Sequence, residues 1–483
     1  MGSGDYTEQF HHRTMQNTGL HRGALGLWML AVASSAFGQP AEANDIARCS
    51  TGWDIGDARV SVGGQHRLMV DGSNFTFHED RVGTAPASVA AQRSRTWFNL
   101  HDRESCRFGV YIQAEVGHLF LGDELESAKT ARVELRRGHF WFKPTSYSLL
   151  RAGVIGWEDR FGQRPTFGDS LWAIDRSDAS RAPLANSAWG FQVGGVTFEA
   201  SVADGWHYRV GTLVLQRADR TIVGNGSSLL FTGDVDREVG SGLIGLSSYY
   251  LRDRGNYSYG RFGGPGPSDG NWDLWLGGRA HLATGRAESA LFLIWNRGDI
   301  SDAGWSHLGW AAKWAMDIPF ERGTLRWQTL YSTGDDGSDP SRSGEFRTIA
   351  QSVRDNLGAQ SYWSLVGITS PRGPSDLTDL GVGLQNDGHG LFTMQAGWEH
   401  PLSASWSLYG AGAWLRADEP NPVSGASNMG TELLGEARWK MASILALDFG
   451  GSWLFTGDFF RTGPAGAKPA SLYQLYARWQ LEF

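Results

Sequence analysis

A chain of 483 residues would ordinarily form about two to four soluble domains, because one hydrophobic core rarely grows beyond about 250 to 300 residues. The composition argues against this, since 65 Gly and 22 Trp occur beside only 41% hydrophobic residues and a mean hydropathy of -0.32. Outside the N-terminus no stretch approaches the roughly 18 apolar residues of a membrane helix, so a membrane protein of this polarity would have to be a β-barrel. The net charge of -8 does not indicate a nucleic-acid partner.

Residues 1–43 have the layout of a secretory signal peptide with an N-terminal extension. His21 and Arg22 precede an apolar segment from Ala24 to Ala33, which is too short to span a bilayer, and small residues follow it. Cleavage after Gly38 and cleavage after Ala43 both fit this layout. Residues 44–56 are then predicted to form a periplasmic arm.

The only two cysteines are Cys49, just after the signal, and Cys106, in the segment HDRESCRF. Export places both in an oxidising compartment. A disulfide between the N-terminal arm and a periplasmic turn is one expectation, and two unpaired thiols are the other, because spacing alone does not decide.

Residues 57–483 are predicted to form an antiparallel, up-and-down outer-membrane β-barrel. Segments of nine to fourteen residues alternate apolar and polar side chains, and they are separated in turn by short turns such as HDRES, KPTS, ATGR, PFER and PLSA and by longer polar loops. The long loops are predicted at 71–92, 157–187, 254–269 and 334–388. Counting strands gives 18, with 16 as the alternative; an even count leaves both termini in the periplasm, and a barrel this wide encloses water.

The clearest alternation is in the final segment, LYQLYARWQLEF, whose odd-numbered residues are mostly apolar and whose even-numbered residues are mostly polar. Tyr473 and Phe483 lie ten residues apart on the apolar face, which corresponds to roughly 25 Å along the membrane normal for a tilted strand. This separation matches the height of an outer-membrane apolar band. The predicted aromatic girdle consists of Trp310, Trp314, Trp406, Trp414, Tyr473, Trp479 and Phe483.

Several stretches resemble the alginate export family of outer-membrane proteins. They are RTWFNLHDRESCRFGVYIQAEVG, GHFWFKPTSYSLLRAG, NMGTELLGEARWK and LDFGGSWLFTGDFF. The resemblance implies an 18-stranded barrel that passes polysaccharide out of the cell along a path of arginines. Gly138 and His139 stand where the family has Arg and Glu, and Val154 and Ile155 stand where it has Arg and Gln, so the resemblance implies the barrel and a transport role more strongly than alginate itself.

The parity of a charged residue, that is, its odd or even position along a strand, predicts whether it faces the lumen or the lipid. An arginine that faces the lumen meets water, while one near the middle of the lipid face costs about 2 to 4 kcal/mol. The predicted pore-lining residues are Arg95, Arg107, Glu115, Arg151, Arg279, Lys313, Arg326, Arg438, Lys440 and Arg478. Asp273, Glu399, Glu436, Asp448 and Glu482 share the inward parity. The excess of cations predicts a modest anion preference, and the alternative is a hydrated lumen in which opposite charges pair across strands. Arg137 has outward parity, which indicates a bulge or a different register in its strand.

The loop predicted at 334–388 is too long for a passive connector. Phe346, Tyr362 and Trp363 could anchor it inside the lumen as a constriction or plug, and an exposed lid is the equal alternative. Asp335, Asp336 and Asp339 offer oxygen ligands of the kind that Ca²⁺ prefers, although a solvated acidic loop explains them more simply.

No enzyme signature and no cofactor are expected. The motifs G-x-S-x-G, H-E-x-x-H and C-x-x-C do not occur, and the G-x-G-x-x-G at residues 240–245 leads into a strand and not into a helix. The sequence therefore favours a channel in the outer membrane of a Gram-negative bacterium, for diffusion or export of polar solutes that could include an anionic or neutral polysaccharide. The alternatives are a barrel that sheathes or docks a partner protein of a secretion or electron-transfer complex and, less strongly, an outer-membrane hydrolase. Expected partners are outer-membrane lipid, lipopolysaccharide, the barrel-assembly machinery and periplasmic export components.

Overall fold

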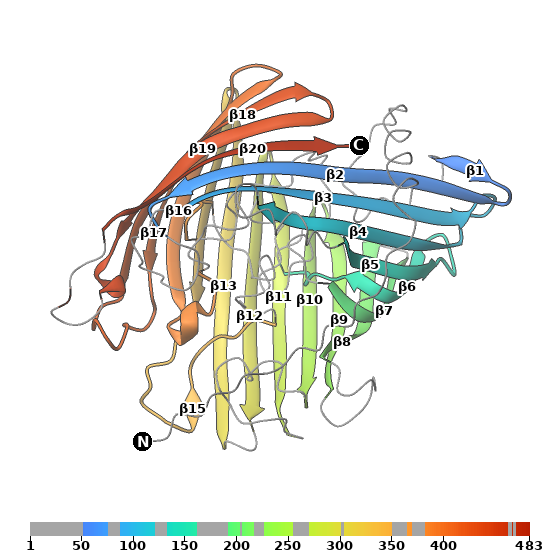
Figure 1. Cartoon of the computed structure of the whole chain (residues 1–483). Helices are drawn as coiled ribbons and strands as arrows, with labels where there is room; N and C mark the ends of the chain where they lie inside the picture. The colour runs from blue at the N-terminus through green and yellow to red at the C-terminus, as the bar shows by residue number, and fades with distance from the viewer. Residues whose placement is uncertain are drawn as a thin grey trace, which may run out of the picture.

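The fold is an antiparallel barrel, and the described residues contain no helix longer than a single 3-10 turn (Figure 1). The computed structural model describes residues 52–75, 87–120, 133–161, 192–202, 205–216, 227–254, 270–300, 304–349, 365–369, 382–461, 466 and 470–483. The strands of the ring are β2 (Ala58–Ser73), β3 (Ala87–Asp102), β4 (Phe108–Phe120), β5 (Val133–Phe142), β6 (Ser148–Gly156), β7 (Gln192–Val202), β8 (Trp206–Gln216), β9 (Ser228–Val239), β10 (Gly242–Asp253), β11 (Trp272–Thr284), β12 (Ala287–Ile300), β13 (Trp305–Phe320), β14 (Gly323–Ser332), β16 (Leu391–Pro401), β17 (Trp406–Arg416), β18 (Asn428–Ala442), β19 (Leu445–Thr456) and β20 (Leu472–Glu482).

Two further strands lie outside the ring. The three-residue β1 (Trp53–Ile55) pairs with the start of β2, and the two-residue β15 (Arg342–Ser343) runs parallel to β13. Leaving these two out of the 20 strands gives 18, as the sequence predicts. Two single 3-10 turns, η7 (Asn386–Gly388) and η8 (Asp458–Phe460), complete the secondary structure of the described residues. Among those residues, no helix is long and apolar enough to cross a membrane.

The ring closes where the two ends of the chain meet. β20 pairs antiparallel with β2 from Gln65 opposite Glu482 to Ser73 opposite Gln474. Beyond this ladder, Gly64 and Phe483 exchange backbone hydrogen bonds of 2.8 and 3.1 Å. Closure leaves no unpaired edge in the ring, which a barrel in lipid requires because lipid offers no hydrogen-bond partner.

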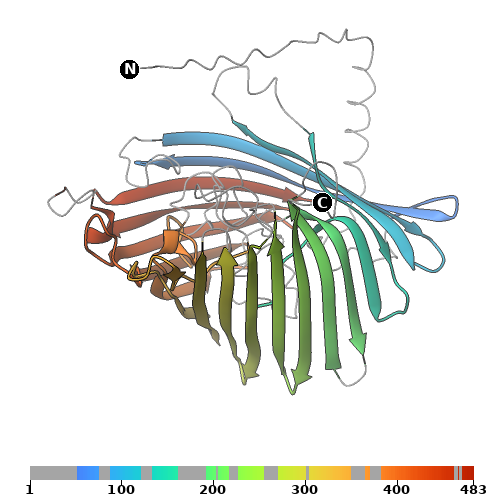
Figure 2. The ribbon, with the colours of Figure 1, turned by 90° about the horizontal axis from the view of Figure 1, so that it is seen from below.

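The barrel wall surrounds a central space. In Figure 2 the blue and red strands, which include β2, β3, β19 and β20, lie on one side of the molecule, and the green to olive strands lie on the other. Connections at one end are short, such as 285–286 and 321–322, while those at the other end include 254–271 and 333–390. The first long loop is shorter than predicted, at 74–86, because β2 continues to Ser73 and β3 starts at Ala87.

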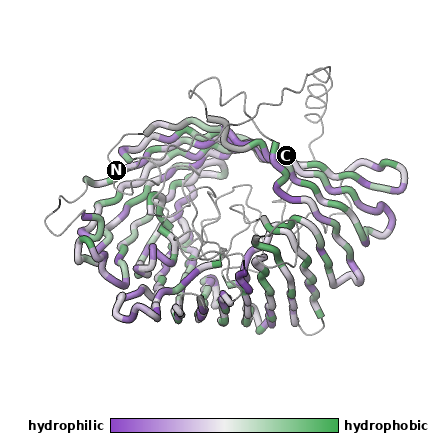
Figure 3. Tube along the Cα trace, turned by 60° about the horizontal axis from the view of Figure 1, so that its bottom comes forward, coloured by the Kyte–Doolittle hydropathy of each residue, from purple (hydrophilic) through white to green (hydrophobic). Residues whose placement is uncertain are grey.

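Hydrophobic and hydrophilic residues alternate along the strands (Figure 3), and the exposed fractions of the side chains show that the apolar ones face outward and most polar ones inward. On β20, Leu475 is 62% exposed, whereas Arg478 on the opposite face is 1% exposed. The predicted girdle residues Trp310, Trp314, Trp414, Tyr473, Trp479 and Phe483 are all exposed. Trp406, the remaining one, is half-buried because its ring stacks on Trp439 at 5.3 Å.

The many glycines allow large side chains to lie flat against the inner wall. A Cβ on Gly109 would come within 2.6 Å of the Trp141 ring, and a Cβ on Gly63 would overlap the Trp97 ring. Trp141 is 1% exposed and its Nε1–H donates to Asn99 Oδ1 at 2.9 Å. Glycines on the inner face therefore let these rings fold onto the neighbouring strand without filling the lumen.

Candidate functional site

The candidate site is the inner face of the barrel together with the loop that enters it. Of the ten predicted pore-lining residues, all but Arg107 and Lys440 are buried or half-buried on the inner face of their strands: Arg95, Glu115, Arg151, Arg279, Lys313, Arg326, Arg438 and Arg478. Arg107 lies in the turn before β4, where it is exposed and donates to the carbonyl of Pro144 at 2.9 Å. Lys440 is exposed at the end of β18, beside the β16–β17 turn. These two positions lie at or beyond the ends of their strands, so neither lines the inner wall.

Many of the inner charges pair across strands, which is the alternative that the sequence left open. Asp448 on β19 accepts a hydrogen bond from Arg438 Nε at 2.6 Å and pairs with Arg478 on its other side. Asp448 and Arg478 are each 1% exposed in their side chains. Such ion pairs fix the inner wall between β18 and β20, because each arginine is held in register by the shared carboxylate.

A second set of ion pairs lines the wall farther along the ring. Arg326 on β14 bridges Asp317 on β13 at 3.0 Å and Glu399 on β16 at 3.1 Å. Arg279 on β11 contacts Asp236 on β9 and lies 3.8 Å from Asp234. In these ion pairs four acids, Asp234, Asp236, Asp317 and Glu399, meet two arginines, so this part of the inner face carries an excess of acid.

Arg151 on β6 pairs with Glu199 on β7 at 2.6 Å. The same carboxylate is contacted by Arg160, just after β6, at 3.5 Å. The backbone N–H of Arg160 donates to the Tyr249 hydroxyl at 3.0 Å, and the Phe161 ring packs edge-on against the same tyrosine at 5.7 Å. The start of the β6–β7 connection thus also lies inside the barrel.

The inner face of β2–β5 carries an excess of arginine that parity analysis only partly anticipated. Its arginines are Arg67, Arg93, Arg95, Arg136 and Arg137, and its acids are Asp71, Glu115 and Glu134. Arg67 and Arg93 are directly opposite each other in the β2–β3 ladder, a placement that is unfavourable for like charges unless other groups compensate. Arg67 donates to Gln480 Oε1 at 3.0 Å, and Glu115 pairs with Arg95 and, at 3.5 Å, with Arg136. We call the five arginines of this surface, Arg67, Arg93, Arg95, Arg136 and Arg137, the arginine face.

Arg137 belongs to this face because of a β-bulge. The register of β4 and β5 shifts between Gln113 and Ala114, so Arg137 lies opposite Gln113 on the inside and is 6% exposed. The outward parity read from the sequence is therefore wrong for Arg137, and the bulge that the sequence suggested is the physical reason. Arg67 and Arg93 could have been found, since Arg93 shares the parity of Arg95.

The long loop after β14 folds into the lumen and contacts β11 and β12 first. Trp275 Nε1–H donates to the carbonyl of Arg347 at 2.7 Å, and the N–H of Arg347 donates to Asn296 Oδ1 at 3.1 Å. Phe346 and Ile349 are fully buried in the same apolar cluster as Trp275. Phe346 therefore anchors the loop as predicted; the other two expected anchors, Tyr362 and Trp363, lie outside the described residues.

The loop then contacts a different part of the wall through residues 365–369. Glu432 on β18 is fully buried, and its Oε1 accepts the N–H groups of Gly367 at 2.8 Å and Ile368 at 2.6 Å. Its Oε2 accepts the N–H of Thr369 at 3.0 Å and the Thr369 hydroxyl at 2.7 Å, and the Ser452 hydroxyl also donates to this carboxylate. A single wall carboxylate thus holds three consecutive backbone amides of the loop.

Further contacts complete this attachment. Gln395 Oε1 accepts the N–H of Leu365 at 2.6 Å, and Tyr409 donates its hydroxyl to the Leu365 carbonyl at 3.2 Å. Ser332 donates to the carbonyl of Leu384 at 2.6 Å. The described parts of the loop therefore lie inside the barrel against two regions of the wall, 346–349 against β11–β12 and 365–369 against β16–β19.

The acidic start of the loop is a set of local turns. Asp336 accepts the N–H of Ser338 at 2.9 Å, and Asp339 accepts the N–H of Ser341 at 2.8 Å. Hydrogen bonds from the side chains and backbone of Ser338 and Ser341 lower the pKa of Asp336 and Asp339, respectively. Within the described part of the chain, no group of three or more His, Cys, Asp or Glu residues could hold a metal ion. Asp335 makes similar contacts, so the geometry supports capping turns and not the calcium site considered from the sequence.

Cys106 follows β3 in the turn to β4 and is disulfide-bonded. Cys49 lies outside the described residues, as do the whole of the predicted signal, 1–43, and most of the predicted arm, 44–56. The pairing of Cys49 with Cys106 thus stays a prediction.

A closed barrel of 18 antiparallel strands, apolar outside and charged inside, has the architecture of a Gram-negative outer-membrane protein. No protein-family model matches the chain, and no curated protein matches it by sequence.

Solved structures match it in fold. The Pseudomonas aeruginosa channel OccK2 (OpdF), solved in complex with glucuronate, has a TM-score of 0.51 and 11% identity over 88% of this chain and 98% of that one. For P. aeruginosa OccK3 (OpdO) the values are 0.50 and 13%, over 88% and 95% of the two chains, and for P. aeruginosa OprD they are 0.49 and 12%, over 88% and 94%. At these identities the likeness concerns the fold alone, so the chain has a porin-like barrel fold. The barrel implied by the alginate-export resemblance is confirmed, and export of a polysaccharide is a separate, functional question.

Proposed function

We propose that the protein is a passive outer-membrane channel for small anionic solutes, and the arginine face is the observation that carries this proposal. Five arginines against three acids on the inner face of β2–β5 give that side of the lumen a positive potential, while the ion pairs of β9–β16 place four acids against two arginines. Basic side chains along a water-filled pore raise the local concentration of anions and speed their entry. The likeness in fold to OccK2 and OccK3 supports the channel class.

Small solutes fit this interior better than a polymer does. Glu432 and Trp275 hold two parts of the loop against the inner wall, where they occupy space that a polysaccharide chain would need. Export of alginate or of another polysaccharide is therefore the second form of the proposal, and it requires the loop to leave the lumen. The barrel-assembly machinery, lipopolysaccharide and periplasmic export components remain proposed partners.

The test uses proteoliposomes that contain the full mature chain and three labelled hexose derivatives of similar size: glucuronate, glucose and glucosamine. We expect glucuronate to enter several-fold faster than glucosamine, with glucose between them. Arg67→Gln together with Arg93→Gln should reduce this ratio, while Arg107→Gln, in an exposed turn, should leave it unchanged. Equal rates for all three solutes would contradict the anion preference, and entry of long uronate oligomers would favour the polysaccharide form.

A further inference from the structure

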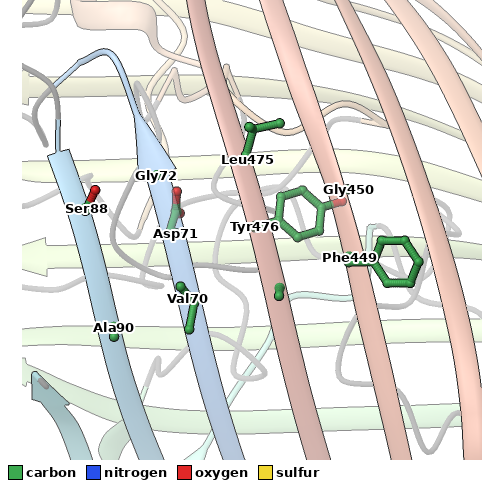
Figure 4. Close-up of a pocket in the computed structure, with 10 residues that line it drawn as sticks. Val70, Asp71, Gly72, Ser88, Ala90, Phe449, Gly450, Leu475 and Tyr476 are labelled. Carbon is green, nitrogen blue, oxygen red and sulfur yellow. The ribbon is translucent and has the colours of Figure 1, made fainter.

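The outer face of the barrel carries its charges only at its two borders. Figure 4 shows an uncharged part near the seam, where Val70, Phe449 and Leu475 project from β2, β19 and β20 and are exposed. Asp71 beside them is buried on the inner face. Among the strands that the structure describes, Arg, Lys, Asp and Glu take outward positions only near strand ends. At the short-turn end these residues are Asp102 and Arg237, and at the long-loop end they are Arg252, Arg297, Asp299 and Arg416.

Two arginines at the long-loop end lie at the level of lipid head groups. Arg297 is two residues beyond the exposed Trp295 on β12, and Arg252 is two residues beyond the exposed Tyr250 on β10. Outward aromatic residues gather at the boundary between hydrocarbon and head groups, and two residues of a tilted strand add about 5 Å along the membrane normal. Outer-membrane barrels have short periplasmic turns and longer extracellular loops, so the long-loop end faces the outer leaflet.

Arg252 and Arg297 belong to one patch of the wall, because β10, β11 and β12 are neighbours (Figure 1). Trp272 on β11 is directly opposite Arg252, and Leu274, two residues farther on, is directly opposite Arg297. With ordinary strand spacing and rise, the two arginine Cα atoms are about 12 Å apart, which two extended side chains can span with one phosphate between them. Within the described residues neither arginine forms an ion pair. Asp299 on β12 is opposite Trp272, so two arginines and one acid leave this patch positive.

We propose that this surface, the outer arginine patch of Arg252, Trp272 and Arg297, binds a phosphate group of lipopolysaccharide in the outer leaflet. The lipid anchor of lipopolysaccharide carries phosphates, and a guanidinium group forms paired, charge-assisted hydrogen bonds with a phosphate. On the side of the patch away from the loops, Leu276 and Trp295 are directly opposite each other and exposed, and they offer an apolar surface to acyl chains. The patch therefore matches both parts of the lipid. It lies outside the lumen, so the proposal is independent of what passes through the channel.

The test measures binding of purified lipid A, the phosphorylated anchor of lipopolysaccharide, to the full mature chain in detergent by native mass spectrometry. Arg252→Gln together with Arg297→Gln should raise the dissociation constant at least about tenfold, because both charge-assisted contacts are lost. The matched control is Arg237→Gln. Arg237 is also exposed on the outer face and lies over the Trp206 ring at 5.0 Å, but it is at the short-turn end, so its loss should leave the dissociation constant unchanged. Single-channel conductance of the double variant should equal the wild-type value, because both arginines face away from the lumen.

Further ligands separate lipopolysaccharide from other sources of phosphate. Lipid A without its phosphates should bind the wild type at least about tenfold more weakly, which tests the phosphate contact without any substitution. Inorganic phosphate should not displace lipid A, and the double variant should bind phosphatidylglycerol as tightly as the wild type does. Unchanged lipid A affinity in the double variant, or equal affinity for the dephosphorylated lipid, would overturn the proposal. So would displacement by inorganic phosphate or an equal loss of phosphatidylglycerol binding, since the patch would then bind any phosphate and not lipopolysaccharide.

Discussion

Glu432 is the residue on which the position of the lumen loop depends most. In Glu432→Gln, one carboxylate oxygen becomes an NH₂ group that points at backbone N–H donors of the loop. At least one of the amides of Gly367, Ile368 and Thr369 then loses its acceptor inside a fully buried site. One unsatisfied buried donor costs about 1 to 3 kcal/mol, and the remaining hydrogen bonds lose the strength that the charge gives them.

We estimate a loss of about 3 kcal/mol, which corresponds to roughly a 100-fold shift toward the released loop, since 1.4 kcal/mol is tenfold. Hydrogen exchange of residues 367–369, followed by mass spectrometry in detergent, measures this shift directly. The amides should exchange about 100-fold faster in the variant, and channel recordings should show larger and noisier openings.

The control is Glu436→Gln, four residues along the same inner face of β18. Glu436 accepts a hydrogen bond from Tyr476 of the wall at 2.7 Å and lies 3.7 Å from Arg438. Its loss should lower the stability of the wall without releasing residues 367–369. If the three amides exchange at the wild-type rate in Glu432→Gln, the carboxylate does not hold the loop and the reasoning is refuted.

Three further predictions concern closure, the ion pairs and pH. Gly64→Val should impair barrel closure, seen as loss of heat-modifiable mobility on gels, because a Cβ there would lie 2.7 Å from the Phe483 ring; Gly435→Val, with nothing within 4 Å of its Cβ, should close normally. Asp448→Asn leaves two buried arginines without their carboxylate and should destabilise the barrel by about 3 to 5 kcal/mol in urea unfolding, and a change below about 1 kcal/mol would show that the pairs are replaceable. Burial, followed by the charges of Asp418, Asp336 and Asp335, raises the pKa of Glu419 in the β17–β18 loop. A raised carboxyl pKa means that the folded loop binds the proton more tightly than the unfolded loop does. The backbone amides of the β17–β18 loop should therefore become better protected from hydrogen exchange as pH falls through that pKa. Glu419→Gln should abolish this pH dependence.

The barrel could be predicted because its strands repeat one simple pattern. Alternation along LYQLYARWQLEF and LFTMQAGWEH identifies the outward face correctly, since every second residue must meet either lipid or the interior. The same rule fails at a bulge, where one extra residue reverses the parity, as it does for Arg137. It also does not tell where a strand ends, which is why Arg107 and Lys440 were expected in the wall.

The interior could be predicted only in part because its contacts join distant residues. Phe346 has the right chemistry for an anchor, but nothing in the sequence shows that its loop meets Trp275 or that residues 367–369 meet Glu432, more than 60 residues away. An acid on an inward position looks like any lumen charge until its partners are known. The opposed Arg67 and Arg93 likewise become visible only when the register of β2 and β3 is known.

Refolding the mature chain into planar bilayers and recording current across a KCl gradient tests the central claim most directly. We expect discrete conductance steps and a reversal potential whose sign shows that chloride permeates more readily than potassium. A bilayer that stays silent at all voltages, for the wild type and for Glu432→Gln alike, would contradict the channel, and a cation-selective reversal potential would contradict the role of the arginine face.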